Sequence, residues 1–143
     1  LALRRSEQSY RAVFEHGGDG IAIIRDGQFV DCNEACLKLY GCSREQLIGK
    51  GPSDISPERQ RSGRTSVVVT REMLALATHN GSQRFEWRHR RFDGTEFDAE
   101  VTLTPIRIGG VPHFVAAVRD VTARKQAELS LRESAQQLEA CYA

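Results

Sequence analysis

The chain has 143 residues, which is enough for one domain with a buried core of its own. Hydrophobic residues make up 40% and charged residues 27%, and 20 basic against 19 acidic residues leave a formal net charge of +1. This balance disfavours nucleic acid or an anionic membrane surface as partner, and no apolar run approaches the ~20 residues that cross a bilayer. The four cysteines are few for a disulfide framework and favour reduced thiols in a cytoplasmic protein.

The first elements expected along the chain are a helix and a hairpin. Residues 1–16 carry apolar side chains at helical spacing, namely Leu3, Tyr10, Val13 and Phe14, and should form an N-terminal flanking helix. Two strands, 20–25 and 28–31, follow around Asp26-Gly27, a strong signal for a tight hairpin turn. The chain starts at Leu1 rather than Met, so we expect it to be part of a longer protein.

Helices are expected between residues 33 and 80. Asn33 is a typical helix N-cap, and Gly41 ends the helix that it starts. Ser-Arg-Glu-Gln at 43–46 is a capping box for a short helix, and Ser-Pro-Glu at 56–58 predicts another with proline at its first position. A longer helix is expected from about residue 67 to 78, although its three successive valines disfavour helix. Its apolar face would hold Val69, Met73, Leu76 and Ala77.

The last strands differ in their hydrophobic pattern. Between Phe97 and Leu103 apolar and polar residues alternate, which predicts a strand with one face in water. Residues 114–118 are apolar throughout, which predicts a strand covered on both faces. We assign Val115 and Ala117 to one face, and Phe114, Ala116 and Val118 to the outer one. That outer face would need cover from the N-terminal helix or from a second copy of the chain.

After Asp120 the pattern becomes helical to the end of the chain. Leu131, Ala135, Leu138 and Tyr142 follow the spacing of a coiled-coil seam, although less than two heptads are present. The expected organisation is therefore a flanking helix at 1–16, a domain at 17–121, and a C-terminal signalling helix at 122–143 that begins a coiled-coil linker.

The order of these elements, β-β-α-α-α-β-β-β, and several motifs resemble the PAS sensory-domain family. The resemblance covers roughly residues 10–130. The matching segments are Asp-Gly-Ile at 19–21, Phe-Val-Asp-Cys-Asn-Glu-Ala at 29–35, Leu-Tyr-Gly at 39–41, Ser-Arg-Glu-Gln-Leu-Ile-Gly-Lys at 43–50, Phe-Glu-Trp-Arg at 85–88, Asp-Gly-Thr at 93–95 and Arg-Asp-Val-Thr-Ala-Arg-Lys at 119–125.

The resemblance implies an α+β fold in which short helices cover one face of a five-stranded antiparallel sheet, with helices flanking it at both ends. It also implies a ligand pocket, a homodimer formed through the flanking helices, and an output domain elsewhere in the parent protein. The parent expected first is a histidine kinase of a two-component system; the alternatives are a diguanylate cyclase and a chemoreceptor. The fragment itself shows no nucleophile–base pair and is not expected to be an enzyme. A ligand-free dimerisation or protein-interaction module is the competing function.

Three sets of candidate residues follow. The ligand-pocket candidates are Met73, Leu76, Ala77, Trp87, Val101, Val115 and Ala117. The signal-exit motif comprises Asp120, Thr122 and Arg124, of which Asp120 and Thr122 can bond free backbone N–H groups at the start of the last helix. The dimer-interface candidates are Leu3, Tyr10, Val13, Phe14, Phe114 and Val118.

No cofactor or metal is favoured. Haem-binding members of the family place a histidine on the longer helix, where His79 stands, but at a helix end that is usually solvated. His16, His89 and His113 are expected at the surface or in strands. Residues 51–62 lack the cysteine of light-sensing flavin proteins, and Cys32, Cys36 and Cys42 lack zinc-finger spacing. The basic run 88–91 is expected to pair with acidic residues across strands rather than to bind nucleic acid.

Overall fold

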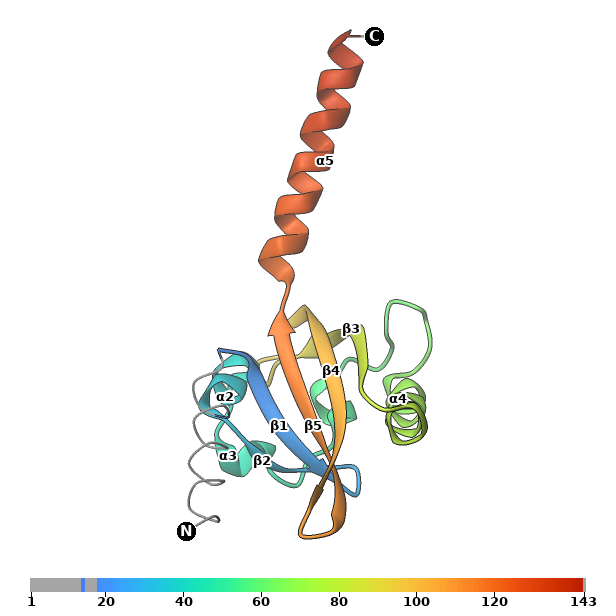
Figure 1. Cartoon of the computed structure of the whole chain (residues 1–143). Helices are drawn as coiled ribbons and strands as arrows, with labels where there is room; N and C mark the ends of the chain where they lie inside the picture. The colour runs from blue at the N-terminus through green and yellow to red at the C-terminus, as the bar shows by residue number, and fades with distance from the viewer. Residues whose placement is uncertain (1–13, 15–17, 143) are drawn as a thin grey trace.

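The computed structural model describes Phe14 and residues 18–142 and has an α+β fold built on a five-stranded antiparallel sheet. The sheet order is β2-β1-β5-β4-β3, so the last strand lies at the centre (Figure 1). The fold class predicted from the sequence is confirmed. The predicted helix at 1–16, including Leu3, Tyr10 and Val13, lies outside the described residues apart from Phe14, which is buried.

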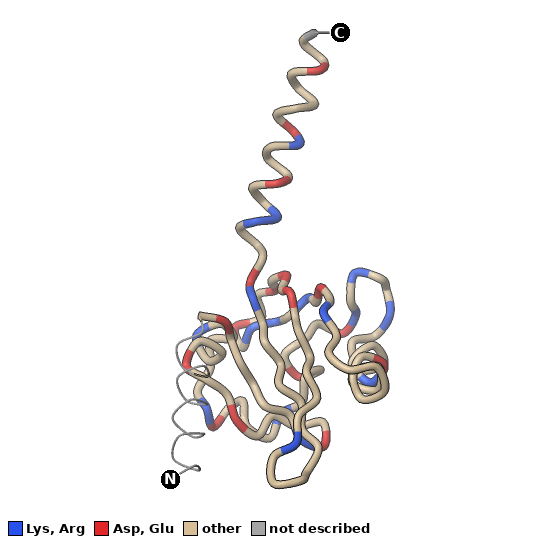
Figure 2. The backbone as a smooth tube through the Cα atoms, in the orientation of Figure 1, with Lys and Arg blue, Asp and Glu red and all other residues tan. Residues whose placement is uncertain are grey.

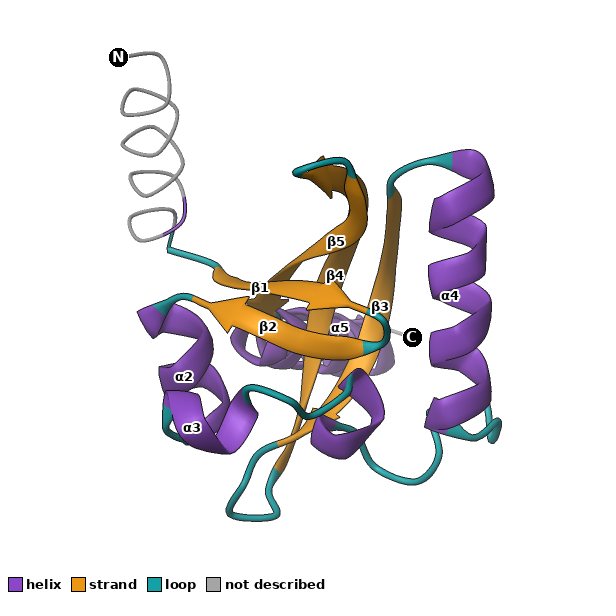
Figure 3. Ribbon diagram, turned by 90° about the horizontal axis from the view of Figure 1, so that it is seen from below, coloured by secondary structure: helices purple, strands orange, loops and turns teal. Residues whose placement is uncertain are grey.

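The elements are as follows. The strands are β1 (Gly20–Arg25), β2 (Gln28–Cys32), β3 (Gln83–Arg90), β4 (Glu96–Ile108) and β5 (Val111–Asp120). The helices are α2 (Glu34–Tyr40), α3 (Arg44–Leu47), the 3-10 helix η1 (Pro52–Ile55), α4 (Ser66–Asn80) and α5 (Thr122–Tyr142). The four elements from α2 to α4 lie around the inner face of the curved sheet, whereas α5 projects away from it (Figures 1 and 3).

Local signals determine the first half of the fold. Asp26 and Gly27 both have positive φ, 52° and 75°, as the tight turn between β1 and β2 requires. The Asn33 side chain accepts a hydrogen bond from the backbone N–H of Cys36, and Gly41 ends α2 in the left-handed conformation at φ 66°. The capping box of α3 is also present. These predictions are confirmed.

The prediction of a helix that starts at 56–58 is wrong, because the short helix lies one turn earlier. η1 begins at Pro52, and the carboxylate of Asp54 accepts a hydrogen bond from the backbone N–H of Gly51 at 2.8 Å. Ser56 follows η1, and its hydroxyl is used in the core: it donates to the carbonyl of Pro52 at 2.7 Å and accepts from Nε1 of Trp87 at 2.9 Å. This tertiary contact competes with the capping role that the sequence suggested.

Helix α4 is longer than predicted, and the assignment of one residue to its inner face is wrong. It runs from Ser66 to Asn80 despite the three valines, of which Val67 and Val68 are substantially exposed. Ala77 is fully buried, but Leu76 is 40% exposed. Met73 and Ala77 are four residues apart and share a face, whereas Leu76 is rotated away from it.

The face assignment of β5 is also wrong. Ala116 pairs with Leu103 and Val118 pairs with Val101 across the β4–β5 ladder. Directly paired residues in an antiparallel sheet point to the same face, so Ala116 and Val118 follow the buried residues of β4 into the core. Both are about 95% buried, and Phe114 packs against the same cluster. Val115 and Ala117 therefore lie on the outer face, where they pair with Ile23 and Ile21 of β1.

Candidate functional site

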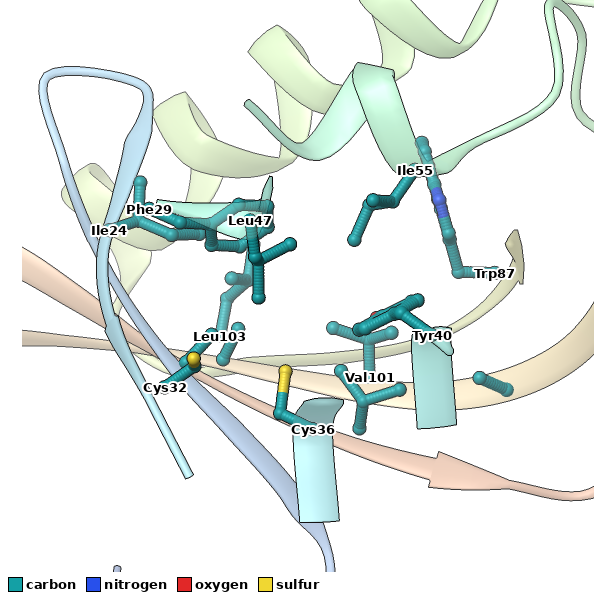
Figure 4. Close-up of a cluster of buried hydrophobic side chains, with 14 of the residues drawn as sticks. Ile24, Phe29, Cys32, Cys36, Tyr40, Leu47, Ile55, Trp87, Val101 and Leu103 are labelled. Atoms are coloured by element: carbon teal, nitrogen blue, oxygen red, sulfur yellow. The ribbon is translucent and has the colours of Figure 1, made fainter. Parts of the chain in front are cut away.

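A small cavity of about 50 Å³ lies inside the core, between the inner face of the sheet and the helices η1 and α4. Its walls are apolar side chains from elements far apart in sequence, including Ile24, Phe29, Ile55, Trp87 and Val101. In Figure 4, Ile24, Phe29 and Leu47 lie on one side of this region of the core, with Ile55, Tyr40 and Trp87 on the other.

The structure brings only part of the predicted pocket together. Met73, Trp87 and Val101 line the cavity, whereas Leu76, Ala77, Val115 and Ala117 do not. Val118, predicted to lie in a dimer interface, lines the cavity instead. His79 is exposed in the last turn of α4 and is not part of the cavity wall. The reversed face of β5 and the rotation of Leu76 account for most of these differences.

His89 lies in a strand, β3, as expected, and it also lines the cavity. It is 95% buried, and one of its ring nitrogens, Nδ1, lies 3.3 Å from the carbonyl oxygen of Ile55. The hydroxyl of Tyr40 lies 3.3–3.4 Å from the two ring nitrogens. Burial lowers the pKa of His89 to about 4, so its imidazole is neutral at pH 7. The two-residue period of β3, which places Phe85 and Trp87 inward, could have indicated His89.

Thr70 supplies a third polar group to the cavity wall. Thr70 lines the cavity, and its Oγ1 atom is buried without a hydrogen-bond partner among the described residues. A buried hydroxyl that lacks a partner costs about 1–3 kcal/mol, which makes it a candidate contact for a bound molecule.

The loop after η1 fastens the free edge of β3 beside the cavity. The side-chain amide of Gln60 accepts from the backbone N–H of Arg88 at 2.8 Å and donates to its carbonyl at 3.0 Å. The Gln60 amide thus makes the two backbone hydrogen bonds that a neighbouring strand would make at this edge position. Arg61 of the same loop forms an ion pair with Asp98 at 2.7 Å, and this pair lowers the pKa of the Asp98 carboxyl. The loop is therefore tied to both β3 and β4.

The junction between β5 and α5 rests on one side-chain cap. The carboxylate of Asp120 accepts from the backbone N–H of Thr122 at 2.9 Å and lies 3.4 Å from Arg91. The Oγ1 atom of Thr122, in contrast, is buried without a partner in the described part of the chain, so the predicted second cap is wrong. The backbone N–H of Val121 donates to the carbonyl of Asp98 at 3.0 Å and continues the pairing with β4.

Ion pairs hold the first turn of α5 against the outer face of β3 and β4. Lys125 lies 3.0 Å from Glu86 and 3.9 Å from Asp98, and Arg124 lies 3.8 Å from Glu100. Figure 2 shows charged residues of both signs where α5 leaves the sheet. Such exposed pairs are individually weak, but together they connect the helix to two strands.

The basic residues of β3 take part in the same charged surface. Arg88 pairs with Glu96 at 2.7 Å, and Arg84 pairs with Glu100 across the β3–β4 ladder. The cross-strand pairing predicted for the run 88–91 is confirmed for Arg88, and Arg84, which lies outside that run, pairs in the same way.

The cysteines form no recognisable metal site. Cys32, Cys36, Cys42 and Cys141 are all free thiols, and burial raises the pKa of the first three. Among the described residues no group of three His, Cys, Asp or Glu side chains could hold a metal ion. Over the same residues, no helix has the length and apolar character required to span a bilayer.

Sequence comparisons show that this chain is similar to parts of known signalling proteins. The protein-family model described as PAS domain matches residues 18–123. The chain is 29% identical over 141 residues to the methyl sulfide methyltransferase-associated sensor of Methanosarcina acetivorans, covering 97% of this chain and 14% of that protein. It is 28% identical over 133 residues to the sensor protein FixL of Bradyrhizobium diazoefficiens, covering 92% of this chain and 26% of that protein. It is 30% identical over 111 residues to the diguanylate cyclase DgcM of Escherichia coli K12, covering 78% of this chain and 26% of that protein.

Solved structures share the same fold. The PAS domain of a protein from Colwellia psychrerythraea superimposes with a TM-score of 0.70 at 24% identity, covering 83% of this chain and 98% of that one. The PAS domain of a LuxR-family transcriptional regulator from Burkholderia thailandensis, solved in complex with ethanol, gives a TM-score of 0.62 at 22% identity. It covers 78% of this chain and 96% of that one. The chain thus covers most of the length of the two solved domains named above, but only about a quarter or less of the length of the curated relatives.

Proposed function

This chain belongs to the PAS domain family, and we propose that it senses a small ligand in its core cavity and relays binding through α5 to an output domain. The observation that carries the proposal is the continuity between cavity and helix. Ala116 and Val118 of β5 line the cavity, and the same strand runs into α5 with only Val121 between them. A change in packing beneath β5 therefore acts on the strand that positions the helix.

The cavity supports binding of a ligand smaller than most cofactors. Typical ligand sites measure roughly 300–1,000 Å³, whereas this cavity has about 50 Å³. The similar domain from Burkholderia thailandensis was solved in complex with ethanol, a molecule of this size. Haem and flavin are not favoured, because either would require the core to open.

Asp98 supports the relay to α5. Its carboxylate binds Arg61 of the loop beside the cavity and lies near Lys125 of α5, while its backbone carbonyl holds Val121. We infer that a ligand that displaces the loop changes the strength of the Arg61–Asp98 ion pair, and thereby the attraction between Asp98 and Lys125. Arg61 and Lys125 share this carboxylate with Arg88, which lies 3.5 Å from it, so a shift at the loop reaches the helix without a change of fold.

The Asp120 cap provides a test of the relay. In the parent protein, Asp120→Ala is expected to abolish the ligand-dependent change in output and to lower the free energy of unfolding by only about 1 kcal/mol, the usual net contribution of one hydrogen bond. Ser43→Ala removes an exposed side-chain bond to the backbone N–H of Gln46 at the start of α3, on the side of the domain away from α5 (Figure 1), and serves as the control. Output assays and urea unfolding of both variants measure the two effects. A normal ligand response from Asp120→Ala would contradict the relay.

The identity of the output domain belongs to the same proposal. The relatives that this chain matches include a sensor protein and a diguanylate cyclase. A histidine kinase is proposed first and a diguanylate cyclase second, with a chemoreceptor as a further alternative. The four free thiols suit a reducing compartment and support a cytoplasmic location.

We further infer a homodimer through α5, because Leu131 and Leu138 are exposed by 73% and 58% at the spacing of a coiled-coil seam. Leu131→Glu is expected to abolish dimerisation, since it places a charge in the seam of both helices. Leu129→Glu, at a position two residues away and also exposed, is the control and should leave the dimer intact. Because fewer than two heptads are present, we expect a weak dimer that sedimentation equilibrium detects only at high concentration. An equal loss in both variants would argue against this seam.

A further inference from the structure

The size of the cavity limits the number of atoms that a ligand can have. A water molecule needs roughly 10–15 Å³ of this kind of space, and the cavity offers about 50 Å³. There is thus room for about three to five non-hydrogen atoms without displacement of core side chains. Larger molecules would have to move Ile55 of η1 or Met73 of α4, which form part of the wall.

The charge of the cavity wall limits the ligand further. None of the residues that line the cavity is Lys, Arg, Asp or Glu. Among the described residues of the wall, His89 is the one whose ordinary pKa, 6.5, lies near neutral pH, and burial lowers that pKa to about 4, so its imidazole is uncharged at pH 7. An ion would lose its hydration and find no opposite charge, whereas an uncharged molecule would not meet this penalty.

The polar atoms of the wall indicate which functional group an uncharged ligand carries. Trp87 and Ser56 satisfy each other, and Tyr40 contacts His89. When the Tyr40 hydroxyl donates to His89, its oxygen remains able to accept a further hydrogen bond. The hydroxyl of Thr70 has no partner among the described residues and can both donate and accept. A ligand hydroxyl, which also donates and accepts, matches this pair of groups better than a purely apolar molecule.

We propose that the cavity binds a short aliphatic alcohol of about three to five non-hydrogen atoms, whose hydroxyl bonds Thr70 and whose carbon chain contacts the apolar walls. The inference rests on the proposed function, because it names the class of molecule that the sensory cavity takes. Binding is expected to be weak, since even efficient ligands of this size contact few atoms, and dissociation constants on the order of millimolar follow.

Titration of the protein by NMR tests the proposal with two probes of equal size. 1-Propanol should shift the backbone amides of cavity residues such as Trp87 and Val101 in a saturable manner. n-Propylammonium, which has the same number of non-hydrogen atoms and a positive charge, should bind at least about tenfold more weakly because its charge would be unpaired in the cavity. Equal affinity for the two probes, or no saturable shift with 1-propanol, would overturn the proposal.

Variants locate the contact. Thr70→Val keeps the shape of the side chain and removes its hydroxyl, so the affinity for 1-propanol should fall about five- to tenfold. Binding of xenon, which needs no hydrogen bond, should be unchanged. Thr78→Val is the control: it lies on the same helix, and its exposed hydroxyl bonds the carbonyl of Leu74. Unchanged 1-propanol affinity in Thr70→Val would mean that this hydroxyl does not hold the ligand. Ala116→Leu, which fills the cavity, should abolish binding of both 1-propanol and xenon.

The same spectra separate this inference from the proposed function. If 1-propanol binds the cavity but the amides of the first turn of α5 do not respond, the relay fails and the ligand class stands. If the charged probe binds as well as the alcohol and the amides of α5 respond, the relay stands and the ligand class fails.

Discussion

Asn33→Ala is expected to lower the free energy of unfolding by about 3–5 kcal/mol, the largest effect among the substitutions considered. The side chain of Asn33 is fully buried and bonds four backbone groups. It accepts from the N–H groups of Ile21 and Cys36 at 3.0 and 2.9 Å, and donates to the carbonyls of Phe14 and Asp19 at 2.5 and 3.0 Å. Alanine would leave these buried groups without partners and would disconnect β1 from α2 and from the chain before it.

Urea unfolding measures this effect, and Ser43→Ala is the matched control. Ser43 is also an N-cap, but it lies at the surface, and among the described residues its hydroxyl bonds the backbone N–H of Gln46 alone. Its loss should cost about 1 kcal/mol. Asn33→Asp separates the two roles of the amide: it keeps the acceptor but places a carboxylate against the carbonyls of Phe14 and Asp19, so it should also be strongly destabilising. If Asn33→Ala lies within 1 kcal/mol of Ser43→Ala, the network has little energetic importance.

Acidification is expected to destabilise the fold by about 3 kcal/mol between pH 6.5 and pH 4 through His89 alone. Burial lowers the pKa of His89 from 6.5 to about 4 in the folded state. In this interval the unfolded chain binds a proton that the folded chain excludes, so the free energy of unfolding falls as the pH falls. Above pH 6.5 the imidazole is neutral in both states, and its contribution to stability is complete.

The His89→Phe variant tests the pH dependence, because phenylalanine fits beside Tyr40 and Phe97 and cannot bind a proton. Its free energy of unfolding should change about 3 kcal/mol less than that of the wild type across the same pH range. His79→Gln, at an exposed site on α4, is the control substitution of a histidine outside the core. The lowered pKa values of the Asp98 and Glu72 carboxyls, ordinarily 3.8 and 4.5, act equally on the wild type and on His89→Phe and therefore cancel in this comparison. An identical slope in wild type and His89→Phe would show that the folded and unfolded chains bind the His89 proton equally, and that burial does not lower its pKa.

Most local structure could be predicted from the sequence, because it depends on neighbours along the chain. The turn at Asp26-Gly27, the caps Asn33 and Ser43, and the alternation of β4 each act over a few residues. The predictions that failed concern residues that can form either of two different interactions. Ser56 could cap a helix or bond Trp87, and the tertiary bond prevailed.

The sequence by itself determined the family, the order of the elements and the start of α5, since these depend on motifs and short-range hydrogen bonds. Only the tertiary structure decided which face of β5 enters the core and which residues meet at the cavity. Residues 114–118 are apolar on both faces, so their hydrophobic pattern does not indicate which face of β5 enters the core. Pairing with Val101 and Leu103 of β4 sets the orientation. The same pairing positions Val118 against the cavity, and the alternation of β3 brings His89 beside Tyr40, 49 residues away in the chain.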